Sequence, residues 1–250
     1  MSSRTTTAAF LFRDAFRPLV EFIYPPLCFV CESRLPDGRS RVCSTCWSDI
    51  RPVLPDDQLF REMQERLTQS TTSQVPHLLS LFHFEKDGTL QSIIHQLKYD
   101  GMTVLGIELG RLLGEKLMTQ FAGYSIHGIV PVPLHPAKLR ERGYNQSEQV
   151  ARGIKEVIDI PVFASLLRRK KYTASQTKLT AMERKMNVGD AFIVNTRDLA
   201  AVEGKTLVLV DDVITTGATI EACASALLKT GSAKVIAASV ALADHRLALP

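Results

Sequence analysis

The chain has 250 residues, of which 45% are hydrophobic and 22% are charged, and its formal net charge is +4. This length suits one α/β domain with an additional module, and the composition excludes a disordered or fibrous protein. Because no apolar stretch approaches the roughly 20 residues that cross a bilayer, we expect a soluble globular protein without a transmembrane segment.

Residues 1–24 show the hydrophobic periodicity of a helix. The apolar residues that recur at steps of three and four positions are Phe12, Phe16, Leu19, Val20 and Ile23. This spacing predicts an amphipathic helix that docks onto another surface. A transit peptide is the alternative, because the segment is rich in Ser and Thr and has no acidic residue before Asp14.

Four of the five cysteines lie close together and define a small module, which we place at residues 25–55. They form two Cys-x-x-Cys pairs, Cys28 with Cys31 and Cys43 with Cys46. Two such turns bring four thiolates to one tetrahedral ion, so the pattern predicts a structural zinc site. Two disulfides, a redox site and an iron–sulfur cluster are the alternatives. Disulfides are disfavoured because nothing marks the chain as secreted, and we therefore expect a cytoplasmic protein with reduced thiols.

Residues 56–76 are polar and punctuated by proline, which predicts a linker or mobile flap. Residues 77–250 then alternate between strand-like and helical patterns and are assigned to one domain. Strands are predicted at 77–84, 129–132, 162–167, 206–210 and 234–242. Helices are predicted at 90–99, 104–121, 146–158 and 219–229, the last with Cys223 as a buried small hydrophobe. The alternation predicts an α/β fold whose mainly parallel sheet is covered by helices on both faces.

The most informative segment follows the strand at 206–210, where two acids precede a turn and a helix. Its candidate site residues are Asp211, Asp212, Thr215, Thr216, Gly217, Ala218 and Thr219. Ligands of open α/β sheets lie at the carboxyl ends of strands, and a helix N-terminus offers unpaired N–H groups, so the turn is predicted to bind a phosphate. The acids can accept hydrogen bonds from vicinal sugar hydroxyls, whereas a generic turn would leave two carboxylates uncompensated.

This segment resembles the phosphoribosyl pyrophosphate (PRPP) motif of type I phosphoribosyltransferases, in which the paired acids hold the ribose hydroxyls and the turn binds the 5-phosphate. Other segments resemble the ComF/GntX-like family of competence-associated proteins. They are 24–28, 97–101, 130–135 and 140–146. The resemblance implies a type I phosphoribosyltransferase-like fold with an N-terminal zinc knuckle, and PRPP as a ligand together with Mg²⁺.

Residues 138–185 carry twelve Lys and Arg against five Asp and Glu, a local net charge of +7 that favours an anionic partner. Candidate pyrophosphate-binding residues are Lys98, Lys138, Arg140, Arg142 and Asn145. Guanidinium groups suit this role because they pair bidentately with phosphate oxygens. The alternatives are a charge that favours a helix C-terminus for Lys98, a helix cap for Asn145, and a solvated loop for the other cations.

Residues 168–187 are too polar for a core and too long for an ordinary connector, which predicts a functional loop. In the transferases that the chain resembles, a loop at this place closes over PRPP. The positions that resemble it are Arg169, Gln176, Arg184 and Asn187. A disordered segment that binds nucleic acid is the alternative.

Two functions remain open, because the sequence shows no recognisable pocket for an acceptor base. The first, implied by the resemblance, is a PRPP-binding protein of the ComF type associated with DNA uptake, whose surplus cations contact single-stranded DNA or uptake proteins. Tyr144 and Tyr172 are then the candidates for base stacking. The second is an active phosphoribosyltransferase, a glycosyltransferase that acts on an unidentified base or amine.

Overall fold

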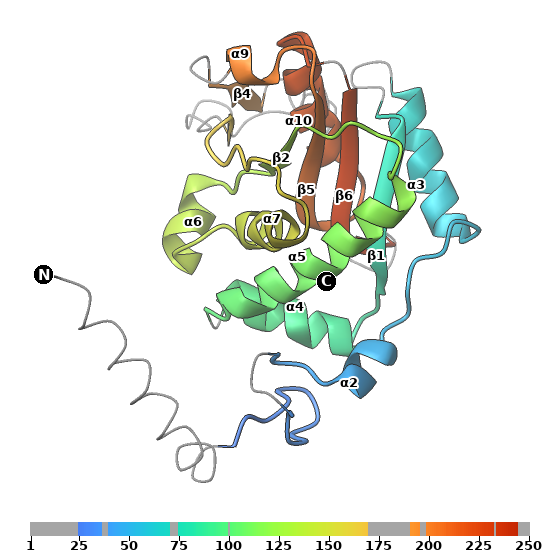
Figure 1. Cartoon of the computed structure of the whole chain (residues 1–250), viewed down its shortest axis with the longest axis vertical. Helices are drawn as coiled ribbons and strands as arrows, with labels where there is room; N and C mark the ends of the chain where they lie inside the picture. Colours follow the sequence, from blue (N-terminus) through green and yellow to red (C-terminus); the bar gives the residue numbers. More distant parts are fainter. Residues whose placement is uncertain are drawn as a thin grey trace, which may run out of the picture. The chain divides into compact units, whose positions relative to one another are not determined.

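The computed structural model describes residues 25–36, 40–70, 75–99, 101–169, 191–195, 199–232 and 234–244. The chain divides into two compact units, Met1–Asp49 and Ile50–Pro250 (Figure 1). The expected helix over residues 1–24 lies outside the described residues, as do Tyr172, Gln176, Arg184 and Asn187.

The first unit is organised around its cysteines. Cys28 begins a tight turn, in which the N–H of Glu32 donates to the Cys28 carbonyl at 2.8 Å. Cys43 caps the short helix α2 (Ser44–Ser48), where its sulfur accepts from the N–H of Cys46. Besides Cys28 and Cys46, the buried apolar residues of this unit include Leu35 and Val42. In the described part of this unit, two of the cysteines therefore belong to the buried core.

The second unit is built on a parallel sheet, whose four strands lie in the order β1-β6-β5-β2 (Figure 1). Their bounds are β1 His77–Phe84, β2 Gly128–Pro131, β5 Thr206–Ile214 and β6 Lys234–Ala243. β6 is buried along almost its whole length, as a strand covered on both faces must be. This confirms the predicted α/β fold with a mainly parallel sheet.

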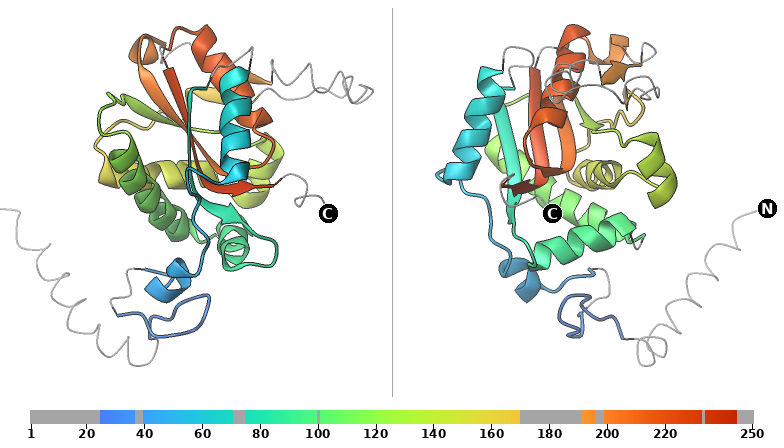
Figure 2. Two further views of the ribbon diagram at one scale, coloured as in Figure 1. Left: turned by 90° about the vertical axis from the view of Figure 1, so that its right-hand side faces the viewer. Right: turned by 180° about the vertical axis from the view of Figure 1, so that it is seen from behind.

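Helices cover both faces of this sheet (Figure 2). The helices of the second unit are α3 Gln58–Gln69, α4 Thr89–Tyr99, α5 Thr103–Gln120, α6 Pro136–Arg142, α7 Gln146–Val157, α9 Leu199–Val202 and α10 Ala218–Lys229. One face packs on α3 and α10 in a single apolar cluster, while α5 and α7 pack on the other face. α5 and α7 approach closely, since a β-carbon at Gly110 would lie 2.1 Å from the carbonyl oxygen of Val150.

The structure corrects the expectation of a linker or flap at residues 56–76. Helix α3 occupies residues 58–69, and its Met63 and Leu67 are buried. These two side chains lie one turn apart on one face of a helix whose other positions are largely polar, so the overall polarity of the segment concealed the helix. Within the described parts of the chain, no helix is both long enough and apolar enough to cross a membrane.

Two strand predictions also need correction. Strand β5 does not end at Val210 but continues to Ile214, because its pairing with β6 extends to Ile214 and Leu242. The strand predicted at 162–167 is wrong, since Val162 makes a single bridge to Ile129 and the chain then turns. A short antiparallel ribbon follows, formed by β3 (Leu167–Arg169) and β4 (Phe192–Val194).

Candidate functional site

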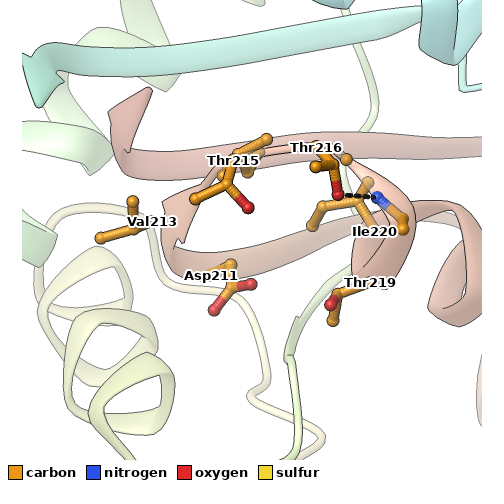
Figure 3. Close-up of a pocket in the computed structure, with 9 residues that line it drawn as sticks. Asp211, Val213, Thr215, Thr216, Thr219 and Ile220 are labelled. Atoms are coloured by element: carbon orange, nitrogen blue, oxygen red, sulfur yellow. Dashed lines mark hydrogen bonds between the residues drawn. The ribbon is translucent and has the colours of Figure 1, made fainter. Parts of the chain in front are cut away.

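A polar pocket lies where β5 passes through a turn into α10 (Figure 3). It has a cavity volume of about 30 Å³, room for a small group such as part of a phosphate. Asp211 and residues 213–220 line it. Gly217 has φ of 75°, the left-handed conformation that favours glycine, and α10 begins at the next residue. The N–H of Ala218 is directed toward Thr216 Oγ1 at 3.4 Å. The turn thus joins hydroxyl groups, a glycine and a helix N-terminus, as the sequence predicted.

Helix α3 supports this turn from one side. A β-carbon at residue 217 would lie 3.0 Å from Met63 Sδ and 3.2 Å from Leu67 Cδ2. Arg66 and Glu221, whose Nε and Oε1 are 3.7 Å apart, form an ion pair between α3 and α10. The segment that was expected to be a linker therefore helps to shape the predicted phosphate site.

The paired acids have different partners. Asp211 Oδ1 accepts hydrogen bonds from Ser147 Oγ at 3.1 Å and from the N–H of Asp212 at 2.9 Å. Asp212 Oδ1 accepts from the N–H of Val213 at 2.9 Å, and its Oδ2 lies 2.9 Å from the ammonium nitrogen of Lys98. Both carboxylates are therefore compensated by groups of the protein itself, which the sequence analysis did not foresee.

Because of these partners and their burial, the pKa values of the two acids are shifted in opposite directions. Burial, followed by the neighbouring charge of Asp212, raises the pKa of Asp211 well above its ordinary value. Burial also opposes ionisation of Asp212, but the ammonium of Lys98 outweighs it and holds the pKa of Asp212 below its ordinary value. Asp212 is thus the member of the pair that ionises more readily, and Asp211 is the member that takes up a proton more readily.

Two further predicted residues lie on the segment that leads into α7. Arg142 places its guanidinium over the ring of Tyr99, 5.2 Å from the centroid, and donates to Gln146 Oε1 at 3.0 Å. Asn145 caps α7 by accepting from the N–H of Ser147, and its amide donates to the carbonyl of Val132 at 2.9 Å. The capping role considered for Asn145 is therefore confirmed.

This segment also contains unpaired polar groups. Gln146 is 1% exposed, and within the described ranges neither its Nε2 nor Arg142 Nε has a hydrogen-bond partner. Tyr144 donates its hydroxyl to the carbonyl of Leu97, which ties the segment before α7 to the end of α4. Tyr144, one of the two expected stacking residues, thus has a role inside the fold.

The remaining predicted cations are less closely tied to the acids. Lys138 and Arg140 are exposed on α6, which His135 caps by accepting from the N–H of Ala137 at 3.2 Å. Arg169 belongs to β3, where its guanidinium lies 5.5 Å from the ring centroid of Phe192. Its buried Nε has no hydrogen-bond partner among the residues that the structure describes.

Lys98 and Ser147 complete the site from distant parts of the chain. Lys98 belongs to α4 and was predicted as a pyrophosphate ligand, whereas the structure pairs it with Asp212. Ser147 was not predicted. A serine in the first turn of a helix is common, and its sequence position carries no sign that β5 passes beside it. Ser147 and Asp211 are 64 residues apart in the sequence, and only the tertiary fold brings them together.

The cysteine cluster has the geometry of a four-sulfur metal site. The ligand atoms of Cys28, Cys31, Cys43 and Cys46 all lie within 4.8 Å of one another. Sulfurs of Cys28 and Cys46 are 3.9 Å apart, and those of Cys31 and Cys43 are 3.7 Å apart. Thiolates at ~2.3 Å from one tetrahedral zinc lie roughly 3.8 Å from each other, so the cluster fits this ion.

The four thiols differ in acidity, because a backbone hydrogen bond favours the thiolate of Cys43 whereas burial raises the pKa of Cys46. The N–H of Cys43 donates to Cys28 Sγ at 3.3 Å, and the N–H of Cys46 donates to Cys43 Sγ at 3.4 Å. The latter bond is the main reason that the pKa of Cys43 is lowered to about 6. Cys223, by contrast, is fully buried in α10, as predicted. The four cysteines form a closed donor set without an obvious place for a substrate.

Comparison with known families identifies two domains in the chain. Residues 88–250 match the phosphoribosyl transferase domain family, and residues 19–57 match the double zinc ribbon domain. The fold and these matches together define a protein with an N-terminal zinc ribbon that is followed in the sequence by a phosphoribosyltransferase-type domain. Within this class, the chain belongs to the family of the DNA utilization protein YhgH and the competence proteins F and ComFC. This is the family that the sequence motifs resembled.

The similarity extends over most of the chain. YhgH of Escherichia coli K12 is 30% identical over 84% of this chain and 94% of the relative. Competence protein F of Haemophilus influenzae is 26% identical over 82% of this chain and 91% of the relative. Competence protein ComFC of Bacillus subtilis is 27% identical over 83% of this chain and 80% of the relative. The similarity to each of these relatives therefore extends over more than four fifths of this chain.

Proposed function

We propose that this protein binds PRPP with Mg²⁺ at the segment from Asp211 to Thr219 and serves as a PRPP-binding factor in the uptake or use of DNA. The main support for the proposal is that the two acids and the polar turn lie in one strand–turn–helix unit. A ribose 5-phosphate group carries both a phosphate, which the turn would bind, and two vicinal hydroxyls, which the acids would bind.

The 5-phosphate, the ribose hydroxyls and the pyrophosphate of PRPP each match different residues of the site. The 5-phosphate would accept hydrogen bonds from the turn and benefit from the positive end of the α10 dipole. The ribose hydroxyls would donate to Asp211 and Asp212. Arg142, held beside Tyr99, offers a guanidinium to the pyrophosphate, with Asn145 next to it. Mg²⁺, when bound, would neutralise part of the pyrophosphate charge.

The basic residues farther from the acids belong to the same proposal. Arg169 lies at the end of β3, and its buried Nε has no hydrogen-bond partner in the described part of the chain, which favours a contact of its guanidinium with an anion. Lys138 and Arg140 are proposed to contact the pyrophosphate or, from their exposed positions, a nucleic-acid backbone. Arg184 remains a predicted member of a loop that closes over PRPP.

The zinc ribbon is proposed to be structural. Four sulfurs complete a tetrahedral shell, so a bound zinc would have no position for a substrate, and two of the cysteines belong to the buried core of the first unit. Reduced thiols suit the cytoplasm, where we propose that the protein resides.

A role with DNA is suggested by the names of the relatives, which describe DNA utilization and competence. The net charge of +7 over residues 138–185 is compatible with single-stranded DNA or with partner proteins of DNA uptake. An active transferase is the second candidate, and the phosphoribosyl transferase domain is the observation in its favour.

Titration calorimetry on the full chain tests the proposal. We expect Mg²⁺-dependent binding of PRPP by the wild type, and a loss of ~2 to 5 kcal/mol of binding free energy when Asp211 and Asp212 are both changed to Ala, because several charge-assisted hydrogen bonds disappear. The double variant must keep its unfolding transition. Equal affinity in both proteins would refute the site, and consumption of PRPP with any base or amine would instead establish the transferase.

A further inference from the structure

The inference concerns Lys98, whose observed partner differs from the one that the sequence suggested. Its ammonium nitrogen lies 2.9 Å from Asp212 Oδ2. Lys98 comes from the last turn of α4, whereas Asp212 lies within β5. The residue expected to hold pyrophosphate is thus bound to one of the acids expected to hold ribose. While this ion pair persists, the ammonium and Asp212 Oδ2 are engaged with each other, so pyrophosphate and ribose must compete with the ion pair for these two groups.

Lys98 and Arg142 differ in their freedom to move. Arg142 is held by the ring of Tyr99 and by the amide oxygen of Gln146. Lys98 carries a compact charge on a flexible four-carbon stem, and 24% of its side chain is exposed. Its ammonium can therefore turn from Asp212 toward solvent without disturbing the packed core. Arg142 is a fixed cation at this site, and Lys98 is a movable one.

The charge of the ligand decides which partner Lys98 prefers. A pyrophosphate carries more negative charge than a single carboxylate, so it attracts the ammonium more strongly once it lies within a few ångströms. Asp212 then loses its cation and gains a free oxygen for a hydroxyl donor. A ligand without pyrophosphate offers Lys98 no such replacement.

We propose that Lys98 changes partners when PRPP binds: its ammonium leaves Asp212 for the pyrophosphate, and Asp212 then accepts a hydrogen bond from a ribose hydroxyl. Lys98 is by this account a specificity-determining residue. Only a ligand with a pyrophosphate draws Lys98 away from Asp212. The site therefore binds PRPP in preference to ribose 5-phosphate. The inference rests on the proposed PRPP function and adds a basis for selectivity to it.

The test compares two ligands on one variant of the full chain. Lys98→Met and the wild type are titrated with PRPP and with ribose 5-phosphate, each in the presence of Mg²⁺. Affinity of the variant for PRPP should fall about 10- to 100-fold, the effect of losing a charge-assisted hydrogen bond. Affinity for ribose 5-phosphate should rise about 2- to 5-fold, because a partly exposed ion pair no longer has to be broken. Changes of opposite sign are the signature of a partner change.

Lys229→Met is the matched control, since Lys229 is exposed at the far end of α10. It should leave both affinities unchanged. If Lys98→Met fails to fold, Lys98→Gln replaces it, because its amide can still donate to Asp212 but carries no charge for pyrophosphate. That variant should lose affinity for PRPP and keep its affinity for ribose 5-phosphate.

Two results would overturn the inference while leaving the proposed function intact. Equal losses for both ligands would show that Lys98 only maintains the fold of the site, and unchanged affinities would show that it contacts neither ligand. A wild type that binds neither ligand would reject the proposed function itself.

Discussion

Leu67 of α3 lies against Gly217 of the predicted phosphate turn. A β-carbon on residue 217 would lie 3.2 Å from Leu67 Cδ2, and the φ of Gly217 is 75°. The position thus excludes other residues for two separate reasons, backbone conformation and close approach. It also shows that α3 and the turn are packed as one unit, so that changes in α3 will be transmitted to the ligand site.

Gly217→Ala should therefore reduce both stability and PRPP affinity. The left-handed conformation costs a non-glycine residue ~1 to 2 kcal/mol, and the contact with α3 adds about 1 to 3 kcal/mol of overpacking. Urea unfolding measures the sum. The control is Gly204→Ala, because Gly204 has φ of 64° but nothing within 4 Å of its added β-carbon. Equal destabilisation of the two variants would contradict the role of α3.

Ser147→Ala should weaken PRPP binding and also lower the stability of the fold. The hydroxyl of Ser147 orients the Asp211 carboxylate, and a hydrogen bond of this kind contributes about 0.5 to 1.5 kcal/mol, or roughly 2- to 13-fold in affinity. Calorimetry at constant pH measures the change.

Ser225→Ala provides a matched control for this experiment. Ser225 is also buried in a helix, and its Oγ has no partner among the described residues. Its replacement should leave affinity for PRPP intact. Unaltered affinity in Ser147→Ala would show that Asp211 needs no positioning.

The acid pair should make stability depend on pH in a predictable direction. Because the pKa of Asp211 is raised above its ordinary value of 3.8, mainly by burial, the folded protein holds this proton more tightly than the unfolded chain. The associated stabilisation is complete below the ordinary pKa and is lost as the pH rises through the raised pKa. Asp211→Asn is neutral throughout, so its stability relative to the wild type should increase as the pH rises.

Urea unfolding from about pH 4 to about pH 8 checks this expectation. Asp212→Asn should behave in the opposite way, because the pKa of Asp212 is lowered and its ion pair with Lys98 contributes stability above the ordinary pKa. Removal of that pair should destabilise the protein most near neutral pH. Parallel curves for Asp211→Asn and the wild type would show that burial does not perturb Asp211.

One zinc per chain should be found in protein purified without chelator. Cys43→Ser should lose most of this zinc, since a tetrahedral site with three sulfurs binds much more weakly. Cys223→Ala should retain it, because Cys223 lies in α10. Metal analysis by mass spectrometry provides the measurement. Well under half an equivalent in the wild type, with disulfides detected by mass, would reject the zinc site.

Single-stranded DNA, if it is a ligand, should bind with a steep dependence on salt. Changing Lys138 and Arg140 of α6 to Ala should reduce the log–log slope by roughly 1.4, at about 0.7 for each phosphate that is no longer neutralised. Lys86 and Lys229, which are also exposed but lie outside the basic segment 138–185, serve as the control pair. Absence of binding at low salt, or identical slopes in all variants, would assign the surplus charge to PRPP or to solvent.

The sequence by itself determined the parts of this protein that are contiguous in the chain. Asp211 to Thr219 could be identified because one strand–turn–helix unit supplies both acids and the turn. The two Cys-x-x-Cys pairs were equally local. Strand β1 was predicted at its observed bounds, because its apolar run ends at a turn and needs no distant partner to be recognised.

Only the tertiary structure decided what surrounds those segments. Ser147 and Lys98 reach the acids from α7 and α4, and no local pattern reveals such a meeting of distant residues. Helix α3 was overlooked because its stability comes from packing two buried side chains on a largely polar segment. β5 runs past Val210 because pairing with β6 offsets the low strand preference of Asp211 and Asp212. Propensity is local, whereas burial and pairing depend on the whole fold.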